Sequence, residues 1–427
     1  MALVARRFFA FFLILFAVPA MAQPPADPLQ QRADDVVRII RGEADPATVF
    51  SPAFLAQVPV AQIRAISGQL IAGNGAIQRL ERIERAGPHT GIIHVGFERM
   101  IVRMQMAIEP AAPHLVNGLQ VVGSDPRGGD TADALLRDLR ALPGQVSFQI
   151  ARLDGSTWTS LAAHQPDRAL AIGSTFKLII LAELSRQVQA GQRRWNDVVP
   201  IDRHSLPSGL LQDWPLGSPV TIHTLATLMI SRSDNTATDV LLRLVGRENV
   251  EAMMARMGMA SAARNRPFLT TLEAFQLKAD EAAIRTRWAA ADEAARRRLL
   301  RERYEQGGAS IDFSRIFTGG PIAIDTVEWF ASSGDLVKVM DWLRRHGDDT
   351  ARAVMAVNSG LGPDVARRFA YMGFKGGSEP GVINLTFLIR NNAGQWHVVT
   401  GSWNNPAAAV DEARFVGLMT RAVNLVR

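Results

Sequence analysis

The chain has 427 residues, of which 47% are hydrophobic and 21% charged, a composition typical of soluble globular proteins rather than disordered or fibrous ones. This length exceeds what one hydrophobic core usually serves, so we expect two domains. The sequence contains no cysteine, which excludes disulfides, cysteine-bound zinc, iron–sulfur clusters and a thiol nucleophile.

The first 22 residues have the pattern of a cleaved export signal. Arg6 and Arg7 form a basic start, FFAFFLILFAV is an apolar segment too short to cross a bilayer comfortably, and residues 20–22 (AMA) form a small-residue cleavage site. We therefore expect residues 1–22 to be a signal peptide and the mature protein to be exported to the periplasm or secreted. Loss of the two arginines would lower the formal net charge from +6 to +4. The alternative is an uncleaved membrane anchor; no later stretch has the length of a membrane span.

The next segment, residues 27–124, reads as two helices followed by four strands. Residues 27–43 and 54–71 carry apolar residues at helical spacing. In residues 99–108 (RMIVRMQMAI) apolar and more polar residues alternate, as in a half-buried strand, and similar short segments lie at 76–85, 91–97 and 114–122. This order predicts a small α+β domain with a curved antiparallel sheet, ending at a turn-rich linker, SDPRGGDT.

Residues 130–427 read as a second α+β domain. A helix is expected over 131–141, then strands at 146–155 and 156–164 joined by an Asp-Gly hairpin turn. A long helical region follows, and residues 381–403 read as two strands around a turn at 392–394, before a last helix at 410–426. Strands at both ends with helices between them predict one antiparallel sheet flanked by helices, with the terminal strands side by side.

Charge and histidine patterns point away from nucleic acids and metals. Arginines are densest at 285–303, where acids are interleaved, and a mixed-sign helix is typical of a solvated face. No nucleic-acid-binding motif accompanies this charge, so we expect no nucleic-acid partner. The eight histidines show no metal-binding spacing, and we expect neither a metal nor another cofactor.

Three short motifs carry the chemistry. GSTFKL places Ser174 three residues before Lys177, an SDN triplet spans 233–235, and KGGS spans 375–378 directly before an expected strand. A serine hydroxyl is a weak nucleophile that needs an adjacent base, and residues i and i+3 share a helix face. Lys177 can accept a proton only if its pKa is lowered by desolvation or by a second cation, which would be Lys375. Without the other motifs, Ser174 would read as a helix cap and Lys177 as a surface lysine.

In this order, S-x-x-K, S-D-N and K-x-G resemble the motifs of the class A β-lactamase and penicillin-binding-protein superfamily, over roughly residues 130–427. Residues 206–221 and 327–336 look more like the β-lactamase-like proteins of the clavulanic-acid gene cluster. Those proteins pair a small ketosteroid-isomerase-like domain with a lactamase-like domain, which implies such a fold for residues 27–124 and a β-lactamase/transpeptidase-like fold for the rest.

The resemblance implies a role for each motif residue. Ser174 would be the nucleophile with Lys177 as its partner, and the backbone N–H groups of Ser174 and Ser378 would form an oxyanion hole. Ser233 would relay a proton to the leaving nitrogen, whereas Asp234 would brace its loop. The purely structural alternative for the SDN triplet is a turn that ends a helix. The remaining residues would bind the substrate. Asn235 would hold its amide, and Lys375 and Ser378 would bind a carboxylate. Gly376 and Gly377, which have no side chains, would let the ligand approach the strand closely.

Two departures from the family pattern concern turnover. Gly376 stands where the usual motif has a hydroxyl residue, and residues 265–283 lack the Glu-x-x-x-Asn that positions a deacylating water in class A β-lactamases. Glu273 and Glu328 are candidates for that role, but a structural acid is the commoner reading of each. Without an activated water, acylation would outrun deacylation.

The sequence therefore predicts an exported serine hydrolase that acts through an acyl-enzyme on a β-lactam or a related small-molecule amide or ester. An esterase or peptidase of the same superfamily is the first alternative, and a ligand-binding protein with little turnover is the second. For the N-terminal domain, support or shaping of the substrate cleft is favoured over a second active site, since its strands show no well-placed carboxylate.

Overall fold

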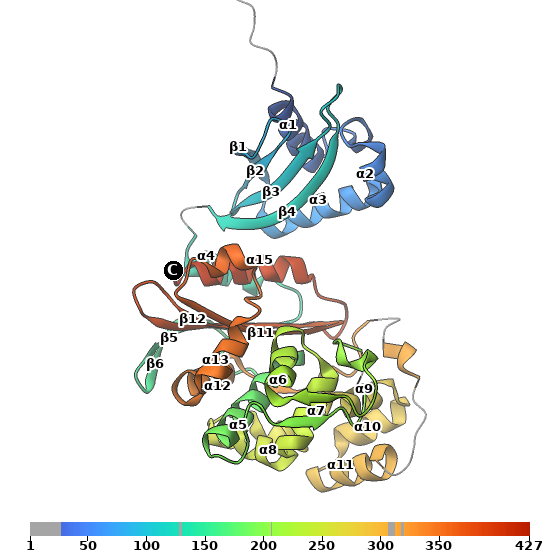
Figure 1. The fold of residues 1–427 in the computed structure, drawn as a ribbon, viewed down its shortest axis with the longest axis vertical. Helices are drawn as coiled ribbons and strands as arrows, with labels where there is room; N and C mark the ends of the chain where they lie inside the picture. Colours follow the sequence, from blue (N-terminus) through green and yellow to red (C-terminus); the bar gives the residue numbers. More distant parts are fainter. Residues whose placement is uncertain (1–26, 128–129, 206, 306–311, 317–319) are drawn as a thin grey trace, which may run out of the picture.

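The computed structural model describes residues 27–127, 130–205, 207–305, 312–316 and 320–427 (Figure 1). The expected signal peptide, residues 1–22, lies outside the described residues, as do residues 128–129 of the expected linker. Among the residues that are described, no helix is both long and apolar enough to cross a membrane.

The N-terminal part is a four-stranded antiparallel sheet with helices packed against it (Figure 1). The helices are α1 (Pro28–Ile40), α2 (Pro52–Gln57) and α3 (Val60–Asn74), and the strands, in sheet order, are β1 (Ile77–Arg85), β2 (Thr90–Phe97), β3 (Met100–Ile108) and β4 (Val116–Pro126). In β3 the apolar residues at alternate positions are buried, as their spacing predicts. Their side chains join those of α1 and β2 in one hydrophobic core.

The helix expected over residues 54–71 is in fact two helices, so this prediction was wrong in detail. α2 ends at Gln57 and α3 begins at Val60, with Pro59 at the N-cap of α3. Proline has no N–H to donate within a helix and disfavours helical backbone in the residue before it, here Val58, which is extended. The apolar spacing continues across the break, which is why periodicity alone did not reveal it.

The C-terminal part is built on a five-stranded antiparallel sheet with the order β11-β12-β13-β5-β6. Its strands are β5 (Gln145–Asp154), β6 (Thr157–His164), β11 (Tyr371–Glu379), β12 (Val382–Arg390) and β13 (Trp396–Asn404). β13 pairs with β5 along its whole length, so strands from the two ends of this part lie side by side, as the sequence predicts. The predicted hairpin turn is present, with Gly155 at φ +57°.

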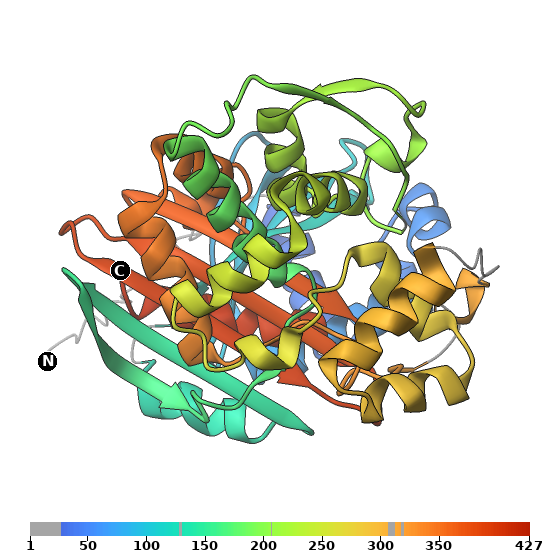
Figure 2. The same ribbon diagram turned by 90° about the horizontal axis from the view of Figure 1, so that it is seen from below.

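Helices cover both faces of this sheet (Figures 1 and 2). α4 (Ala132–Arg140) and α15 (Glu412–Asn424) lie on the face toward the N-terminal part and share one core with the sheet. The opposite face of the sheet packs against a second layer of helices, of which α12 contacts the sheet directly. That layer comprises α5 (Lys177–Gln189), α6 (Ile222–Ser231), α7 (Asn235–Val245), α8 (Arg247–Arg256), α9 (Thr271–Ala279), α10 (Ala282–Ala290), α11 (Glu293–Leu300), α12 (Ser333–His346) and α13 (Asp349–Ala356). The short α14 (Pro363–Ala366) instead joins the core of α4 and α15 through Val365.

Two small two-stranded sheets complete the described strands. β7 (Leu170–Ala171) pairs with β10 (Phe330–Ala331), and β8 (Val198–Pro200) pairs with β9 (Pro219–Thr221). The arginine-rich stretch forms α10 and α11, where Arg297 pairs with both Glu293 and Glu251. Glu293, one of the interleaved acids, thus acts as an ion-pair partner, in keeping with the mixed-sign reading of this region.

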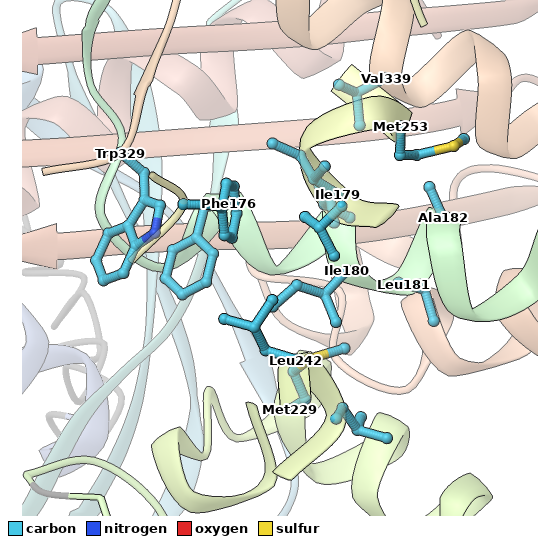
Figure 3. Close-up of a cluster of buried hydrophobic side chains, with 14 of the residues drawn as sticks. Phe176, Ile179, Ile180, Leu181, Ala182, Met229, Leu242, Met253, Trp329 and Val339 are labelled. Atoms are coloured by element: carbon cyan, nitrogen blue, oxygen red, sulfur yellow. The ribbon is translucent and has the colours of Figure 1, made fainter. Parts of the chain in front are cut away.

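α5 is the centre of the larger core (Figure 3). Its first nine residues are all buried, and Leu181 and Ala182 pack among side chains of the surrounding helices. Just before it, the ring of Phe176 stacks on Trp329 with centroids 3.7 Å apart. The predicted apolar run LIILAEL therefore buries the start of this helix on every side, including Lys177, whose exposed fraction is 0%.

α15 is held to the start of the C-terminal part by a buried arginine. The Arg421 side chain is 1% exposed, and its guanidinium contacts Asp130 and Asp138, each at 2.6 Å. α15 also packs against α3 of the N-terminal part. Arg421 thus joins the last helix to α4 and to the segment that precedes it.

We predict that Arg421→Leu lowers the free energy of unfolding by about 3 kcal/mol, because two carboxylates lose the cation that neutralises them. Urea denaturation followed by circular dichroism measures this change. Arg367→Leu is the matched control: Arg367 pairs with Asp364 but its side chain is 70% exposed, so its loss should cost under about 0.5 kcal/mol. Equal losses for the two variants would contradict the prediction.

Candidate active site

A cavity of about 480 Å³ opens where the large sheet meets the helical layer. Segments far apart in the sequence line it: the turn before α5, the loop between α6 and α7, α9, β11 and the start of α15. Of the predicted site residues, the following line it: Ser174, Ser233, Asn235, Lys375, Gly377 and Ser378. The fold therefore brings all three sequence motifs to one place.

Ser174 lies in a 3-10 turn, Gly173–Phe176, that leads directly into α5. The predicted helix thus begins as a tighter turn, in which residues i and i+3 are nearly eclipsed along the axis. Ser174 is partly exposed at the cavity wall, whereas Lys177 is the first residue of α5 and is buried beneath it. The alternative interpretation, a capping serine with a surface lysine, is wrong for Lys177.

The buried ammonium of Lys177 is held by the SDN loop. Its Nζ donates to the carbonyl oxygen of Ser233 at 2.6 Å, to the Ser233 hydroxyl at 3.1 Å and to Oδ1 of Asn235 at 2.8 Å. None of these partners carries a negative charge. Three neutral acceptors can position an ammonium group, but they stabilise its charge less than a carboxylate would.

The electrostatics of this position favour a neutral amine. Burial lowers the pKa of Lys177 well below its usual range, and the nearby Lys375 lowers it further, against opposing effects of Asp239 and Asp234. Both lysine nitrogens lie 3.1 Å from the Ser233 hydroxyl oxygen, so they are at most about 6 Å apart. Two charges at that separation repel by about 3 kcal/mol at an effective dielectric constant of about 20. The second-cation effect expected from the sequence is therefore present.

The SDN triplet is a strained connection between α6 and α7. Ser233 has φ +56°, a left-handed conformation that is uncommon outside glycine. Asp234 caps α7 by accepting the N–H of Ala237, and its other oxygen accepts the N–H groups of Leu210 and Leu211. Asp234 thus braces the loop, as predicted, and leaves Ser233 between the two lysines.

The KGGS motif directly precedes the strand β12, as predicted, and it also lies within a strand itself. Residues 371–379 form β11 and pair residue by residue with β12, including both glycines. Two consecutive glycines usually indicate a break in a strand, but here continuous pairing with β12 keeps them extended. Lys375 projects from this strand to the Ser233 hydroxyl, and burial lowers its pKa to about 7.

β11 approaches the turn that carries Ser174 so closely that position 377 must be glycine. A Cβ at Gly377 would lie 2.3 Å from the Ser174 backbone nitrogen and 2.4 Å from the Ile172 carbonyl oxygen. On the other side, a Cβ at Gly173 would lie 3.2 Å from the Ser378 nitrogen. The backbones of Ser174 and Ser378 are therefore neighbours, which is the arrangement that a pair of oxyanion donors needs.

Neither glutamate proposed for deacylation lines the cavity among the residues described. Glu273 forms a capping box with Thr270 at the start of α9 and an ion pair with Arg247 at 2.7 Å. Glu328 accepts a hydrogen bond from Lys278 at 2.6 Å and is buried. Both are structural acids in these contacts, which was the commoner reading of each.

Sequence reasoning missed two groups near the site. Asp239 on α7 is buried and accepts hydrogen bonds from the Ser205 hydroxyl and from the N–H groups of Thr271 and Leu272, so it fixes the start of α9. An acid within the apolar pattern of TATDVLL was its only signal. Glu379, one residue past the KGGS motif, lines the cavity and contacts Lys278. Within the described part of the chain, no cluster of three or more histidines or acids is arranged to hold a metal ion.

Three solved structures illustrate what this chain is similar to. A β-lactamase from Sphaerobacter thermophilus is 21% identical, with 69% of this chain and 95% of that chain covered and a TM-score of 0.47. A β-lactamase from Chitinophaga pinensis is 16% identical, covers 69% and 97%, and has a TM-score of 0.47. PBP-A is 15% identical, covers 69% and 96%, and has a TM-score of 0.45.

A search of curated proteins found no significant match to this chain. Residues 130–303, which hold the S-x-x-K and S-D-N motifs, match the family model Beta-lactamase2, described as the beta-lactamase enzyme family. The match covers this part of the chain alone, and it points to a β-lactamase-like serine hydrolase.

Proposed function

We propose that the protein hydrolyses a β-lactam, or a related amide or ester, through an acyl-enzyme on Ser174. One observation carries the proposal. The Ser233 hydroxyl is hydrogen-bonded to two buried lysines, Lys177 and Lys375, at the wall of the cavity that Ser174 also lines. A buried amine with a lowered pKa one turn from a serine is the arrangement that activates a hydroxyl nucleophile.

In the acylation step, the Ser174 oxygen attacks the substrate carbonyl carbon as its proton passes to the neutral amine of Lys177. The C–N bond of an amide, or the C–O bond of an ester, then breaks. The leaving group takes a proton through the Ser233 hydroxyl, which lies within hydrogen-bond distance of both lysines. Lys177 is then neutral again, and the acyl group is on Ser174.

Substrate binding is assigned to the groups around this centre. The N–H groups of Ser174 and Ser378 would stabilise the developing oxyanion, since their backbones meet at Gly377. Lys375 and Ser378 would bind a substrate carboxylate, and Asn235 its amide. Gly376 offers no hydroxyl to the ligand, so this site supplies one hydrogen bond fewer than the usual family motif.

We also propose roles for the flanking sequence. The pattern of residues 1–22 supports export, after which the enzyme would act in the periplasm or outside the cell. Residues 27–124 are proposed as a ketosteroid-isomerase-like support, as in the clavulanic-acid-cluster proteins that the sequence resembles. In favour of support, α3 packs on α15, and α15 supplies Glu412 and Val416 to the cavity wall.

Ser174→Ala should abolish acylation, with a fall in kcat/KM of about 1,000-fold or more, because no other group replaces the attacking oxygen. Intact mass spectrometry after incubation with a penicillin, and hydrolysis of a chromogenic β-lactam and an ester, measure this. Ser231→Ala is the control: Ser231 also lines the cavity, but its hydroxyl bonds only within α6, to the Thr227 carbonyl. A penicillin adduct on Ser174→Ala would contradict the assignment of the nucleophile.

The pH profile should depend on whether the substrate has a carboxylate. Lys375 is cationic below its pKa of about 7 and loses its charge as the pH rises above it. We therefore predict that kcat/KM for a carboxylate-bearing β-lactam falls above about pH 7, approaching tenfold per pH unit. A neutral ester should lack this basic limb, since it has no carboxylate for Lys375 to bind.

Lys375→Met should remove the difference between the two substrates, because neither profile would then depend on this cation. Measuring kcat/KM from pH 6 to 9 tests the free enzyme and depends on steps up to acylation only. Parallel profiles of the two substrates with the wild-type protein would show that Lys375 does not bind the carboxylate.

A chain shortened to residues 130–427 should still be acylated at Ser174 by penicillin, because every motif residue lies within it. Its thermal midpoint should fall, since α15 loses the cover of α3. Mass spectrometry and thermal unfolding measure the two effects. Loss of the adduct from a chain that still unfolds cooperatively would mean that the N-terminal part takes a direct part in the reaction.

A further inference from the structure

A second buried charge cluster lies beside the cavity and has no role in acylation. Lys278 on α9 donates to Glu328 at 2.6 Å and contacts Glu379 at the end of β11. The Lys278 and Glu328 side chains are 4% and 2% exposed, whereas that of Glu379 is 15% exposed. Glu379 and Lys278 line the same cavity as Ser174, and Glu328 stands behind them.

The strand geometry places Glu379 on the face of β11 that lies against the turn of Ser174. Side chains on a β-strand alternate between faces, so Lys375, Gly377 and Glu379 share one face of β11. Lys375 on this face reaches Ser233. Gly377 has no side chain, and the turn that carries Ser174 occupies the space where one would lie. Glu379 is the next position on the face, about 7 Å along the strand from Gly377.

The cluster holds two carboxyl groups and only one ammonium. Burial and the neighbouring Glu328 together raise the pKa of Glu379 to about 8, against the opposing effect of Lys278. Burial alone would lower the pKa of Lys278, but Glu328 and Glu379 raise it, so this lysine stays cationic. Glu379 is therefore the carboxyl group that exchanges its proton near neutral pH, as a general base must.

We infer that Glu379 is the base that activates water for deacylation, positioned by Lys278 and Glu328. The inference rests on the proposed acyl-enzyme at Ser174. It fills the place left open by the missing Glu-x-x-x-Asn, with a carboxylate that comes from the strand instead of from residues 265–283.

The step balances with water as the only co-reactant. A water held by the Glu379 carboxylate attacks the acyl carbonyl carbon, forming a C–O bond while one of its protons passes to Glu379. The bond between that carbon and the Ser174 oxygen then breaks. The proton on Glu379 returns to the serine oxygen, directly or through water, so the products are the free acid and the original enzyme.

The other carboxylates near the site fit this role less well. Glu273 is committed to its capping box and to Arg247, away from the cavity. Glu328 is shielded from the cavity by Lys278. Glu412 does line the cavity, but it is exposed at the start of α15 and lies outside the buried cluster.

Glu379→Gln tests the inference in the full chain. We expect acylation by a chromogenic cephalosporin to stay within about 3-fold of wild type, and deacylation to slow by about 100-fold or more. Stopped-flow burst kinetics separate the two rates, and intact mass spectrometry should show an acyl adduct that persists. Glu412→Gln is the matched control, a carboxylate of the same cavity outside the buried cluster, and both of its rates should be unchanged.

Each outcome bears on one of the two proposals. Deacylation at the wild-type rate in Glu379→Gln would overturn the role of Glu379 while leaving the acyl-enzyme intact. Parallel loss of both rates would also overturn it, since it would show that the cluster only holds α9 to β11. Absence of an adduct from the wild-type protein would instead defeat the proposed function on which the inference rests.

A measurement on the wild-type chain covers the case in which Glu379→Gln does not fold. The deacylation rate should rise about tenfold per pH unit and level off near pH 8, where Glu379 loses its proton. The charged groups that face Glu379 are Lys278 from α9 and Glu328 from the segment before β10. A deacylation rate that does not change between pH 6 and 9 would overturn the inference.

Discussion

The site depends on one hydroxyl group placed between two buried lysines. Ser233 accepts a hydrogen bond from each of Lys177 and Lys375, and neither ammonium is neutralised by a carboxylate in direct contact. Such an arrangement costs stability, because desolvation and mutual repulsion both oppose the charged forms. The proposed acylation uses the same cost, since a buried lysine with a lowered pKa can accept a proton from Ser174.

The rest of the larger part of the chain holds that arrangement in place. α5 is buried on all sides, which keeps water from Lys177, and Asp234 is bound by three backbone N–H groups, which keeps Ser233 in its strained conformation. β11 comes so close to the turn that carries Ser174 that only glycine fits at position 377. Each of these contacts joins segments that are far apart in the sequence.

The two lysine environments of the cavity differ in a way that separates their roles. Lys177 and Lys375 are buried against neutral oxygens, and their pKa values are lowered. Lys278 is equally buried but lies between two carboxylates, and its pKa is raised. A lysine of the first kind exchanges protons, whereas one of the second kind serves as a permanent cation that positions its partners. Acylation and deacylation are thus proposed to use different lysine environments of one cavity.

Local patterns in the sequence determined most of the elements and the residues proposed for acylation. Alternation marked β3, the Asp-Gly turn marked the β5–β6 hairpin, and three motifs named the residues that line the cavity. Only the tertiary structure decided which acid lines the cavity beside Ser174. Glu273 and Glu328 were the candidates from the sequence, yet their partners lie elsewhere, whereas Glu379 lines the cavity and shares a strand face with Lys375. The physical reason is that pKa and orientation depend on burial and on neighbours from distant segments, and neither is written in the local spacing of residues.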